Sequence, residues 1–382
     1  MKRLSPGDKK SVMESLYRHP HLTAGLYRIL EMTMFKTIAV ALVAALTLGT
    51  AGAHAGTPIT GAGATFPAPL YAKWAEGYNR STGNQLNYQA IGSGGGIKQI
   101  EANTVDFGAS DKPLTLDEQN KYGLYMFPTV IGGVVPAINI PGVPTGKLKL
   151  PGSVLADIFA GNITVWNDPA ITKWNPGLNI PALPITVVHR SDGSGTTFLF
   201  TSYLSIASDS WKNSVGANDT VEWPTGVAGK GNDGVAALVR GTAGSIGYVE
   251  YAYVMKTQIA YALVASHDAT WPQPTADAFR AATANADWAH APGNYLLVLN
   301  QPGANAWPIT GATFILVYKN QPDAAKAAAV LKFFDYGYKN GDFNAKDLFY
   351  VPLPAEVKSM VRKQWAQNVT SNGSPVYVSP NP

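Results

Sequence analysis

The chain lacks cysteine altogether, since none occurs among its 382 residues. This absence excludes disulfide bonds, thiolate catalysis, cysteine zinc sites and lipid attachment at a cysteine. Histidine is also scarce, because only His189, His267 and His290 follow residue 55, and their spacing matches no metal-binding motif. The sequence therefore predicts a protein without a metal ion or cofactor.

Charged residues are few, at 14% of the chain against 46% hydrophobic residues, which is typical of a globular protein. The net charge of +4 comes from residues 1–55, which hold seven of the 29 basic and three of the 25 acidic residues. This leaves 22 of each sign in the remainder, which is therefore neutral. A protein that binds DNA or RNA electrostatically needs a surplus of Lys and Arg, so we predict no nucleic-acid partner.

Motifs for common catalytic machinery are missing as well. Neither Gly-Lys pair, at 146–147 and 229–230, is followed by the Ser or Thr of a P-loop. Neither Ser93 nor Ser194 lies in a G-x-S-x-G motif, and His189 is expected to point away from its neighbour Arg190 on an alternating strand. We predict that the chain is not an enzyme, with an exported phosphatase or other hydrolase as the less favoured alternative.

The front of the chain has the pattern of an export signal. Lys36 precedes an apolar run of about a dozen residues (37–48), and a stretch of small residues ends in Ala53-His54-Ala55. Such a run is too short for a membrane span, which needs about 20 residues. We predict a leader and signal peptide over residues 1–55, cleavage after Ala55 and a periplasmic product. Translation from Met32 or Met34 is an alternative to the long leader.

From residue 56 onward, strand patterns alternate with helix patterns, as in α/β domains with parallel strands. Pro67 and Pro69 suit the first turn of a helix that would end at Gly83, and a strand (85–91), a helix (94–103) and a strand (105–109) would follow. Further helices are expected at residues 153–159, 195–204, 233–239, 323–338 and 355–369, and further strands at 185–189 and 246–254.

Two long apolar segments, residues 127–140 and 309–318, are predicted to be strands that cross between two domains. Domain I would consist of residues 56–132 and 309–382, and domain II of the inserted residues 133–308. Ligands of such α/β domains bind beyond the carboxyl ends of the strands, where helices begin. We therefore expect a ligand cleft between the two domains, with hinge closure as its motion.

Three junctions that lead into helices are rich in hydrogen-bond donors, namely residues 61–67, 92–96 and 189–197. Glycines allow the backbone to approach an anion closely, and the first N–H groups of a helix have no partner within the helix. Thr65 and Ser93 add hydroxyl groups. Each junction alone could be an ordinary N-cap or flexible turn, but together they predict an oxyanion site.

The third junction is the richest in donors. Ser194, Gly195 and Thr196 present N–H and hydroxyl groups at a helix start, and Arg190 can hold an oxyanion through two parallel hydrogen bonds. Asp192 is close enough in sequence to orient Arg190, or to form an ordinary surface ion pair with it.

Asp111 follows the strand at 105–109 and differs from the other candidates. Alone it could simply cap a turn, but an ionised Asp only accepts hydrogen bonds. A phosphate group near neutral pH still carries a proton that Asp111 could accept, whereas sulfate carries none and would face like charge, which costs several kcal/mol. The pattern predicts a protonated oxyanion, phosphate or arsenate, and disfavours sulfate and molybdate.

The chain closely resembles the periplasmic phosphate-binding proteins of Pst-type ABC import systems from Thr57 to about Val369. The resemblance implies a fold like that of type II periplasmic binding proteins, with two α/β domains, two hinge strands and a phosphate buried between the domains. It also implies an ABC permease in the inner membrane as partner, while a monomer is our default expectation. The segments that carry the resemblance are residues 61–71, 92–100, 102–111, 127–135, 192–203, 229–234 and 246–253.

The same resemblance implies a set of phosphate contacts. Gly94 departs from the family pattern, which often has a second serine there. Asp192 would orient the arginine, and Ala64 and Phe66 would contribute through their backbone N–H groups. The implied contacts are Ala64, Thr65, Phe66, Ser93, Asp111, Arg190, Ser194, Gly195 and Thr196.

Overall fold

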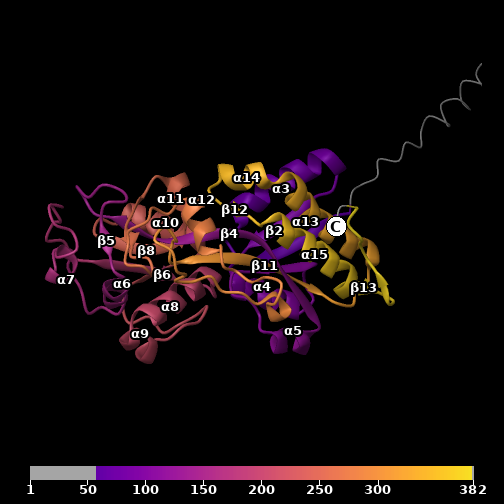
Figure 1. Cartoon of the computed structure of the whole chain (residues 1–382), viewed down its shortest axis with the longest axis horizontal. Helices are drawn as coiled ribbons and strands as arrows, with labels where there is room; N and C mark the ends of the chain where they lie inside the picture. Colours follow the sequence, from indigo (N-terminus) through magenta and orange to yellow (C-terminus); the bar gives the residue numbers. More distant parts are fainter. Residues whose placement is uncertain (1–56, 381–382) are drawn as a thin grey trace, which may run out of the picture. The chain divides into compact units, whose positions relative to one another are not determined.

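A computed structural model describes residues 57–380 of the chain (Figure 1). The predicted leader, signal peptide and cleavage site after Ala55 lie outside the described residues. Within residues 57–380, none of the helices is both long and apolar enough to cross a membrane.

A first group of strands is built mainly from the early part of the chain. The order is β2-β1-β3-β11-β4, with β1 parallel to β2 and β3, and with β11 antiparallel to both β3 and β4. Two helices connect the parallel strands, so the predicted β-α-β unit is confirmed. The elements are β1 (Ile59–Gly63), α3 (Ala68–Thr82), β2 (Leu86–Ala90), α4 (Ser93–Glu101), β3 (Phe107–Ser110), β4 (Leu124–Asn139) and β11 (Thr310–Tyr318).

Helix α3 shows why the sequence pattern was readable. Pro67 precedes its first turn, where a missing N–H costs nothing, and Leu70, Trp74 and Tyr78 form a buried face at four-residue spacing. The helix ends at Gly83, whose φ of 74° is left-handed, and the Gly83 N–H binds the carbonyl of Asn79.

A second group of strands follows the order β4-β8-β6-β7. Strand β6 is parallel to β7 and β8, and β8 is antiparallel to the second half of β4. The predicted helices at 153–159, 195–204 and 233–239 are present here with slightly different ends. The elements are α6 (Gly152–Phe159), β6 (Thr186–Arg190), α8 (Gly195–Ala207), β7 (Val227–Gly229), α10 (Gly231–Gly241) and β8 (Ser245–Glu250).

One predicted strand is wrong in its second half. The apolar run at 246–254 begins as β8, but the chain turns at Glu250 into helix α11 (Tyr251–Thr257). The Glu250 carboxylate accepts a hydrogen bond of 2.8 Å from the Ala252 N–H and so caps this helix. A short apolar run cannot by itself distinguish a buried strand from a buried helix.

The long strand β4 belongs to both groups. Residues 124–133 pair with β11, residues 134–139 pair with β8, and nearly the whole strand is buried. Figure 1 shows β4 and β11 between the elements of the first group and those of the second. Residues from Gly56 onward group as one unit by their contacts, so the predicted division into two domains stays a prediction.

The end of the chain returns to the first group, as the sequence predicts. Helix α13 (Ala324–Asn340) packs on α3 and β1, and α15 (Ala355–Asn368) packs on β4. Several shorter elements were not predicted, including α5 (Leu116–Tyr122), α7 (Pro169–Thr172), α9 (Asp209–Ser214), α12 (Ala276–Ala282), α14 (Asp342–Asp347) and β12 (Val351–Pro352).

Gly96 tests the packing of α4 on the sheet. A Cβ atom there would lie 2.5 Å from the Cα of Gly63 and 2.9 Å from the carbonyl oxygen of Ala109, both rigid backbone. We expect Gly96→Ala to lower the free energy of unfolding by about 1–3 kcal/mol in urea titrations, because overpacking outweighs the better helix propensity of alanine. Gly241→Ala, where a Cβ meets nothing within 4 Å, is the control and should be neutral or slightly stabilising.

Candidate functional site

The strand register brings the predicted loops to one edge of each strand group. Gly63, the last residue of β1, lies opposite Ala90 of β2 and Ala109 of β3, so the loops after these strands open together. Arg190, the last residue of β6, lies opposite Gly229 of β7. Carboxyl ends of parallel strands are where α/β proteins bind ligands.

Loops of the two groups touch each other at these edges. The Gly94 N–H donates to the carbonyl of Gly193 over 2.9 Å. The amide of Asn232 donates to the hydroxyl of Thr65 over 2.7 Å, and the Tyr253 hydroxyl donates to the Thr65 carbonyl over 2.6 Å. The structure thus brings the residues predicted from separate junctions into one cluster.

The cluster is polar yet almost inaccessible to solvent. Six residues are predicted to contact the ligand through their side chains, and each of them is at most 4% exposed: Thr65, Ser93, Asp111, Arg190, Ser194 and Thr196. Buried polar groups need hydrogen-bond partners. The buried groups of the cluster that have no partner in the protein are therefore the ones to which a ligand would bind.

Arg190 is held from one side. Its Nε and Nη2 atoms donate to the two carboxylate oxygens of Asp192 over 2.8 and 2.5 Å, which leaves Nη1 buried without a partner among the described residues. Asp192 also accepts from the Gly231 N–H at 3.0 Å. The pair is therefore a fixed, bidentate arrangement, and it leaves one charged donor free to bind an anion.

The carboxylate of Asp192 stays charged beside Arg190. Burial alone would raise its pKa, but the hydrogen bonds and charge of Arg190, with the N–H of Gly231, hold the pKa below its usual value.

Three hydroxyls of the cluster, besides that of Ser93, are already hydrogen-bond acceptors. Thr65 Oγ1 accepts from the N–H and the side-chain amide of Asn232, and that amide also donates to Thr196 Oγ1 at 3.2 Å. Ser194 Oγ accepts from the Thr197 N–H at 3.0 Å. Because a hydroxyl carries one hydrogen, and none of these three donates to a described residue, all three can donate to a ligand.

The backbone supplies further donors, with one exception to the prediction. Gly195 and Thr196 begin α8, so their N–H groups have no partner within the helix, and the N–H of Phe66 also has none among the described residues. The Ala64 N–H, however, donates to the carbonyl of Ala109 over 2.9 Å. This donor extends the pairing of β1 with β3, so the contact expected from the Ala64 N–H is disfavoured here and stays a prediction.

Asp111 is the second acidic side chain of the cluster, and unlike Asp192 it forms no hydrogen bond with Arg190. Its Oδ1 accepts a 2.7 Å hydrogen bond from Thr313 Oγ1, and its N–H donates to Ser93 Oγ at 3.2 Å. Burial raises the pKa of Asp111 to about 7, against the opposing effects of the Thr313 hydrogen bond, the Arg190 charge and Ser93. The neighbouring turn is held by Ser110 and the backbone of Lys112, so Asp111 is not its cap.

Two contributors were missed at the level of sequence. Thr313 lies in the apolar strand β11, where nothing marks it as polar machinery. Asn232 lies in residues 229–234, which the resemblance includes but to which we assigned no role. The glycines at 229, 231 and 234 around Asn232, at a helix start, were the available signal.

Among the described residues, the serines of the cluster have no histidine to activate them. His189 stacks on Trp223 with ring centroids 4.9 Å apart, while His267 and His290 pair with Asp268 and Asp287. Among residues 57–380, no hydrogen bond joins a histidine to Ser93 or Ser194, and no three acidic or histidine side chains gather as metal ligands. The hydrolase alternative therefore lacks the histidine base that usually activates a serine nucleophile.

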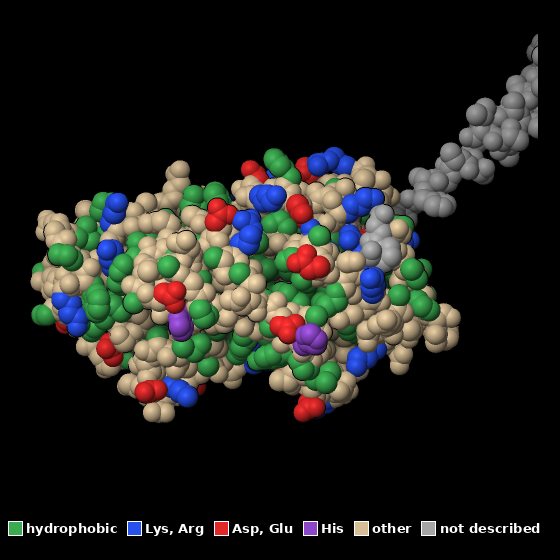
Figure 2. Space-filling view, in the orientation of Figure 1, with side chains coloured by type: hydrophobic (Ala, Val, Ile, Leu, Met, Phe, Trp, Pro, Cys, Tyr) green, Lys and Arg blue, Asp and Glu red, His purple; other side chains and the backbone are tan. Residues whose placement is uncertain are grey.

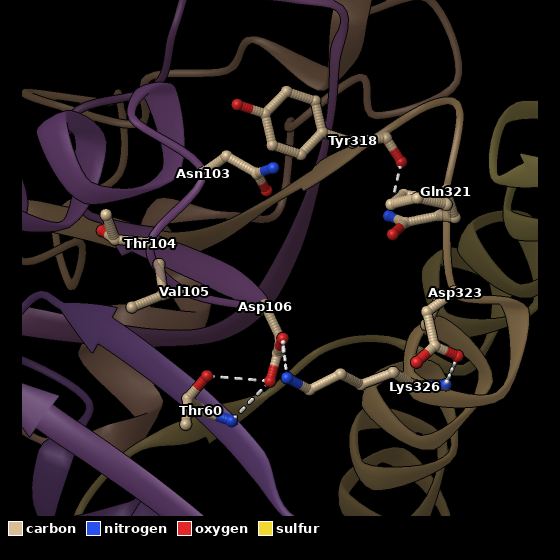
Figure 3. A pocket seen from close by; sticks show the side chains of 11 residues that line it. Thr60, Asn103, Thr104, Val105, Asp106, Tyr318, Gln321, Asp323 and Lys326 are labelled. Carbon is tan, nitrogen blue, oxygen red and sulfur yellow. Dashed lines mark hydrogen bonds and ion pairs between the residues drawn. The ribbon is translucent and has the colours of Figure 1, made fainter.

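A separate pocket of about 330 Å³ lies near the amino ends of β1 and β3 (Figure 3). Its charges are already paired, because Lys326 Nζ lies 2.9 Å from Asp106, whose other oxygen accepts from the N–H and hydroxyl of Thr60. Asp323 caps α13 through the Lys326 N–H. This pocket offers an anion no free donor comparable to Arg190.

The molecular surface carries both signs of charge. Figure 2 shows acidic and basic side chains interspersed on the face that it displays, with no continuous basic tract. This agrees with the neutral composition that follows residue 55, while the absence of a nucleic-acid partner stays a prediction.

Comparison with known proteins first gives the class. Residues 48–336 match the PBP superfamily domain. A phosphate-binding protein from Stenotrophomonas maltophilia has a similar fold, with a TM-score of 0.66 and 23% identity over 85% of this chain and 98% of that one. PfluDING, a periplasmic phosphate-binding protein solved with phosphate, has a TM-score of 0.65 and 23% identity, and the match covers 85% of this chain and 100% of that one. The chain thus belongs to the PBP superfamily, and the predicted fold class is confirmed.

Sequence relatives then give the family. The phosphate-binding protein PstS of Pasteurella multocida is 52% identical over 314 residues, covering 82% of this chain and 91% of its own. PstS of Haemophilus influenzae is 49% identical over 320 residues, covering 84% and 96%. The chain belongs to the PstS family of phosphate-binding proteins. These relatives are named as binding proteins, which confirms the prediction that the chain is not an enzyme.

The raised pKa of Asp111 predicts a pH dependence of stability. The ordinary pKa is 3.8 and the folded value about 7, so the folded protein binds this proton more tightly and loses stability as pH rises through that window. We expect Asp111→Asn, which cannot ionise, to gain about 1–3 kcal/mol over the unsubstituted protein between pH 5 and 7.5.

Urea denaturation of phosphate-free protein at several pH values measures this difference. The exposed carboxylate of Asp347 provides the control, since Asp347→Asn should leave the pH profile in this window unchanged. Parallel profiles for Asp111→Asn and the unsubstituted protein would show that Asp111 is ionised in the folded state throughout the window.

Proposed function

We propose that this protein is a periplasmic receptor that binds inorganic phosphate between the two strand groups and delivers it to an ABC permease in the inner membrane. The observation that carries the proposal is the buried cluster in which one carboxyl group, Asp111, stands among unsatisfied donors. The names of the PstS relatives and of the phosphate-bound structures support the same ligand.

The donors suit a tetrahedral oxyanion that has lost its water. Arg190 supplies a charged N–H from Nη1, and hydroxyl hydrogens come from Thr65, Ser194 and Thr196. The N–H groups of Phe66, Gly195 and Thr196 add neutral donors, and the start of α8 adds the positive end of a helix dipole. Ser93 completes the proposed contacts from the first strand group. Ala64 would contribute only by its position beside Thr65.

Asp111 would select for a proton on the ligand. When ionised, it accepts the hydrogen of a monoprotonated phosphate, and sulfate offers no such hydrogen. Because the pKa of Asp111 is about 7, the protonated carboxyl becomes a donor at lower pH and could then bind sulfate. Selectivity against sulfate would therefore depend on pH. Arsenate offers the same proton and shape, so it would compete with phosphate.

The proposed motion is closure of two domains about β4 and β11. In this proposal, residues 56–132 and 309–382 form one domain and 133–308 the other, with the crossing at Gly132, Gly133 and Ile309. The Val134 N–H donates to the Ile309 carbonyl over 2.8 Å, so the two crossing strands are tied at that point. We further propose export through the signal peptide ending at Ala55, and a monomeric receptor.

Arg190 tests the ligand assignment. We expect purified residues 56–382 to bind one phosphate per chain in calorimetry, and Arg190→Ala to weaken binding about 100-fold or more, because neutral donors must then hold a desolvated anion. Arg240→Ala, at an exposed position late in α10, should bind like the unsubstituted protein. Normal phosphate binding by Arg190→Ala would contradict the assignment, and binding of a sugar or amino acid instead of phosphate would contradict the function.

Asp111 tests the selectivity. Between pH 8 and 5.5, sulfate affinity of the unsubstituted protein should rise as Asp111 becomes protonated. In Asp111→Asn the amide can donate at every pH, so sulfate binding should be stronger at pH 8 and nearly independent of pH. Competition titrations with phosphate, arsenate and sulfate measure both effects. Equal preference of the two proteins at pH 8 would rule out Asp111 as the selecting group.

A further inference from the structure

Asn232 is a buried polar residue whose contacts the phosphate proposal does not use. It is the second residue of α10 and is 0% exposed. Its side-chain Nδ2 donates to Thr65 Oγ1 at 2.7 Å and to Thr196 Oγ1 at 3.2 Å, and its backbone N–H donates to Thr65 Oγ1 at 3.2 Å. Its Oδ1 accepts from the Glu250 N–H at 2.9 Å.

The Glu250 contact determines which way the amide faces. A backbone N–H can only donate, so the oxygen of the Asn232 amide must face Glu250 and the NH2 group must face the two threonines. Thr65 Oγ1 then receives two hydrogens, which occupy both of its lone pairs. The Thr65 hydroxyl can therefore act only as a donor, and its hydrogen must point to another acceptor.

The start of α10 is built to approach Thr65 closely. Gly231 has a φ of 71°, and a Cβ there would lie 3.3 Å from Thr65 Cγ2 and 2.4 Å from Asp233 Oδ1. The Gly231 N–H also binds Asp192, the partner of Arg190. Two adjacent residues of α10 therefore support the arginine and the threonine hydroxyls of the same cluster.

We propose that Asn232 is a positioning residue that makes the Thr65 hydroxyl donate to the bound oxyanion and, by occupying one lone pair of Thr196 Oγ1, turns the Thr196 hydroxyl the same way. Thr65 comes from the first strand group, whereas Asn232 and Thr196 come from the second, so these hydrogen bonds also require the two groups to be in contact. Contact between the two strand groups therefore fixes the direction in which the hydroxyl hydrogens point. This inference rests on the proposed function, because it concerns the same phosphate site.

A mutant cycle tests the inference. Asn232→Ala should weaken phosphate binding about 10-fold or more, because the hydroxyls can then turn away from the ligand. In a protein that carries Thr65→Val and Thr196→Val, Asn232→Ala should change the phosphate Kd by less than about twofold, since no hydroxyl remains to be positioned. A purely structural role would give the same fold-loss in both backgrounds, and that result would overturn the inference.

Asn232→Asp provides a second variant that keeps the shape and the acceptor for Glu250. Its carboxylate would attract the hydroxyl hydrogens and repel the anion, so phosphate binding should fall further than in Asn232→Ala. Binding within threefold of the unsubstituted protein in either variant would also overturn the inference. If the unsubstituted protein itself fails to bind phosphate, the proposed function fails, and the inference with it.

Asn175 is the matched control, because it is also a buried asparagine with a fully bonded side chain. It donates to the carbonyls of Lys149 and Ile171 and accepts from the Lys149 N–H, and none of these residues belongs to the cluster. Asn175→Ala should lower the melting temperature and leave the phosphate Kd unchanged. If the Asn175 control lowers affinity as much as Asn232→Ala, the effect is one of general stability and the inference is wrong.

Discussion

A buried guanidinium with one unpartnered NH2 group, that of Nη1, is the constraint on which the site depends. A charge removed from water is costly unless it is paired, and Asp192 neutralises only one edge of Arg190. The other edge is left for an anion, which would complete the pairing. Apart from Asp111, the other groups of the cluster have the same need, because the hydroxyls and the helix N–H groups are donors that no described residue accepts from.

Close approach of backbones makes this cluster possible. At Gly63, Gly96 and Gly231, a side chain would collide with backbone or with a neighbouring residue of the site, so the sheet, α4 and α10 can pack only where glycine stands. Because glycine has no side chain, the N–H groups at these helix starts are also left uncovered. Packing and binding chemistry therefore follow from one feature of the sequence, namely glycine placed at the end of a strand (Gly63) and in the first turns of helices (Gly96 and Gly231).

Much of this architecture was predictable, and the failures have physical reasons. The βαβ unit around α3 could be predicted because a proline at the helix start, apolar residues at four-residue spacing and a glycine at the helix end all indicate the same helix. The segment after Glu250 was not, because an apolar run suits either helix or strand and the deciding cap is one carboxylate. Donors such as Thr65 and Ser194 were predicted from local motifs, whereas Thr313 and the occupied N–H of Ala64 depend on pairing between distant strands. Asn232 acts on residues 167 and 36 positions away, a relation that no local pattern contains.

The hydrogen bond from Gly94 to Gly193 joins two positions that carry no side chain. A Cβ at residue 94 would lie 3.1 Å from both the Cα of Gly193 and a carboxylate oxygen of Asp219, tighter than most real contacts. A chain with serine at this place must therefore hold the facing loop a few tenths of an ångström further out. Gly94, Gly193 and Asp219 are therefore packed as one unit, in which a larger residue at position 94 has room only if one of the other two moves.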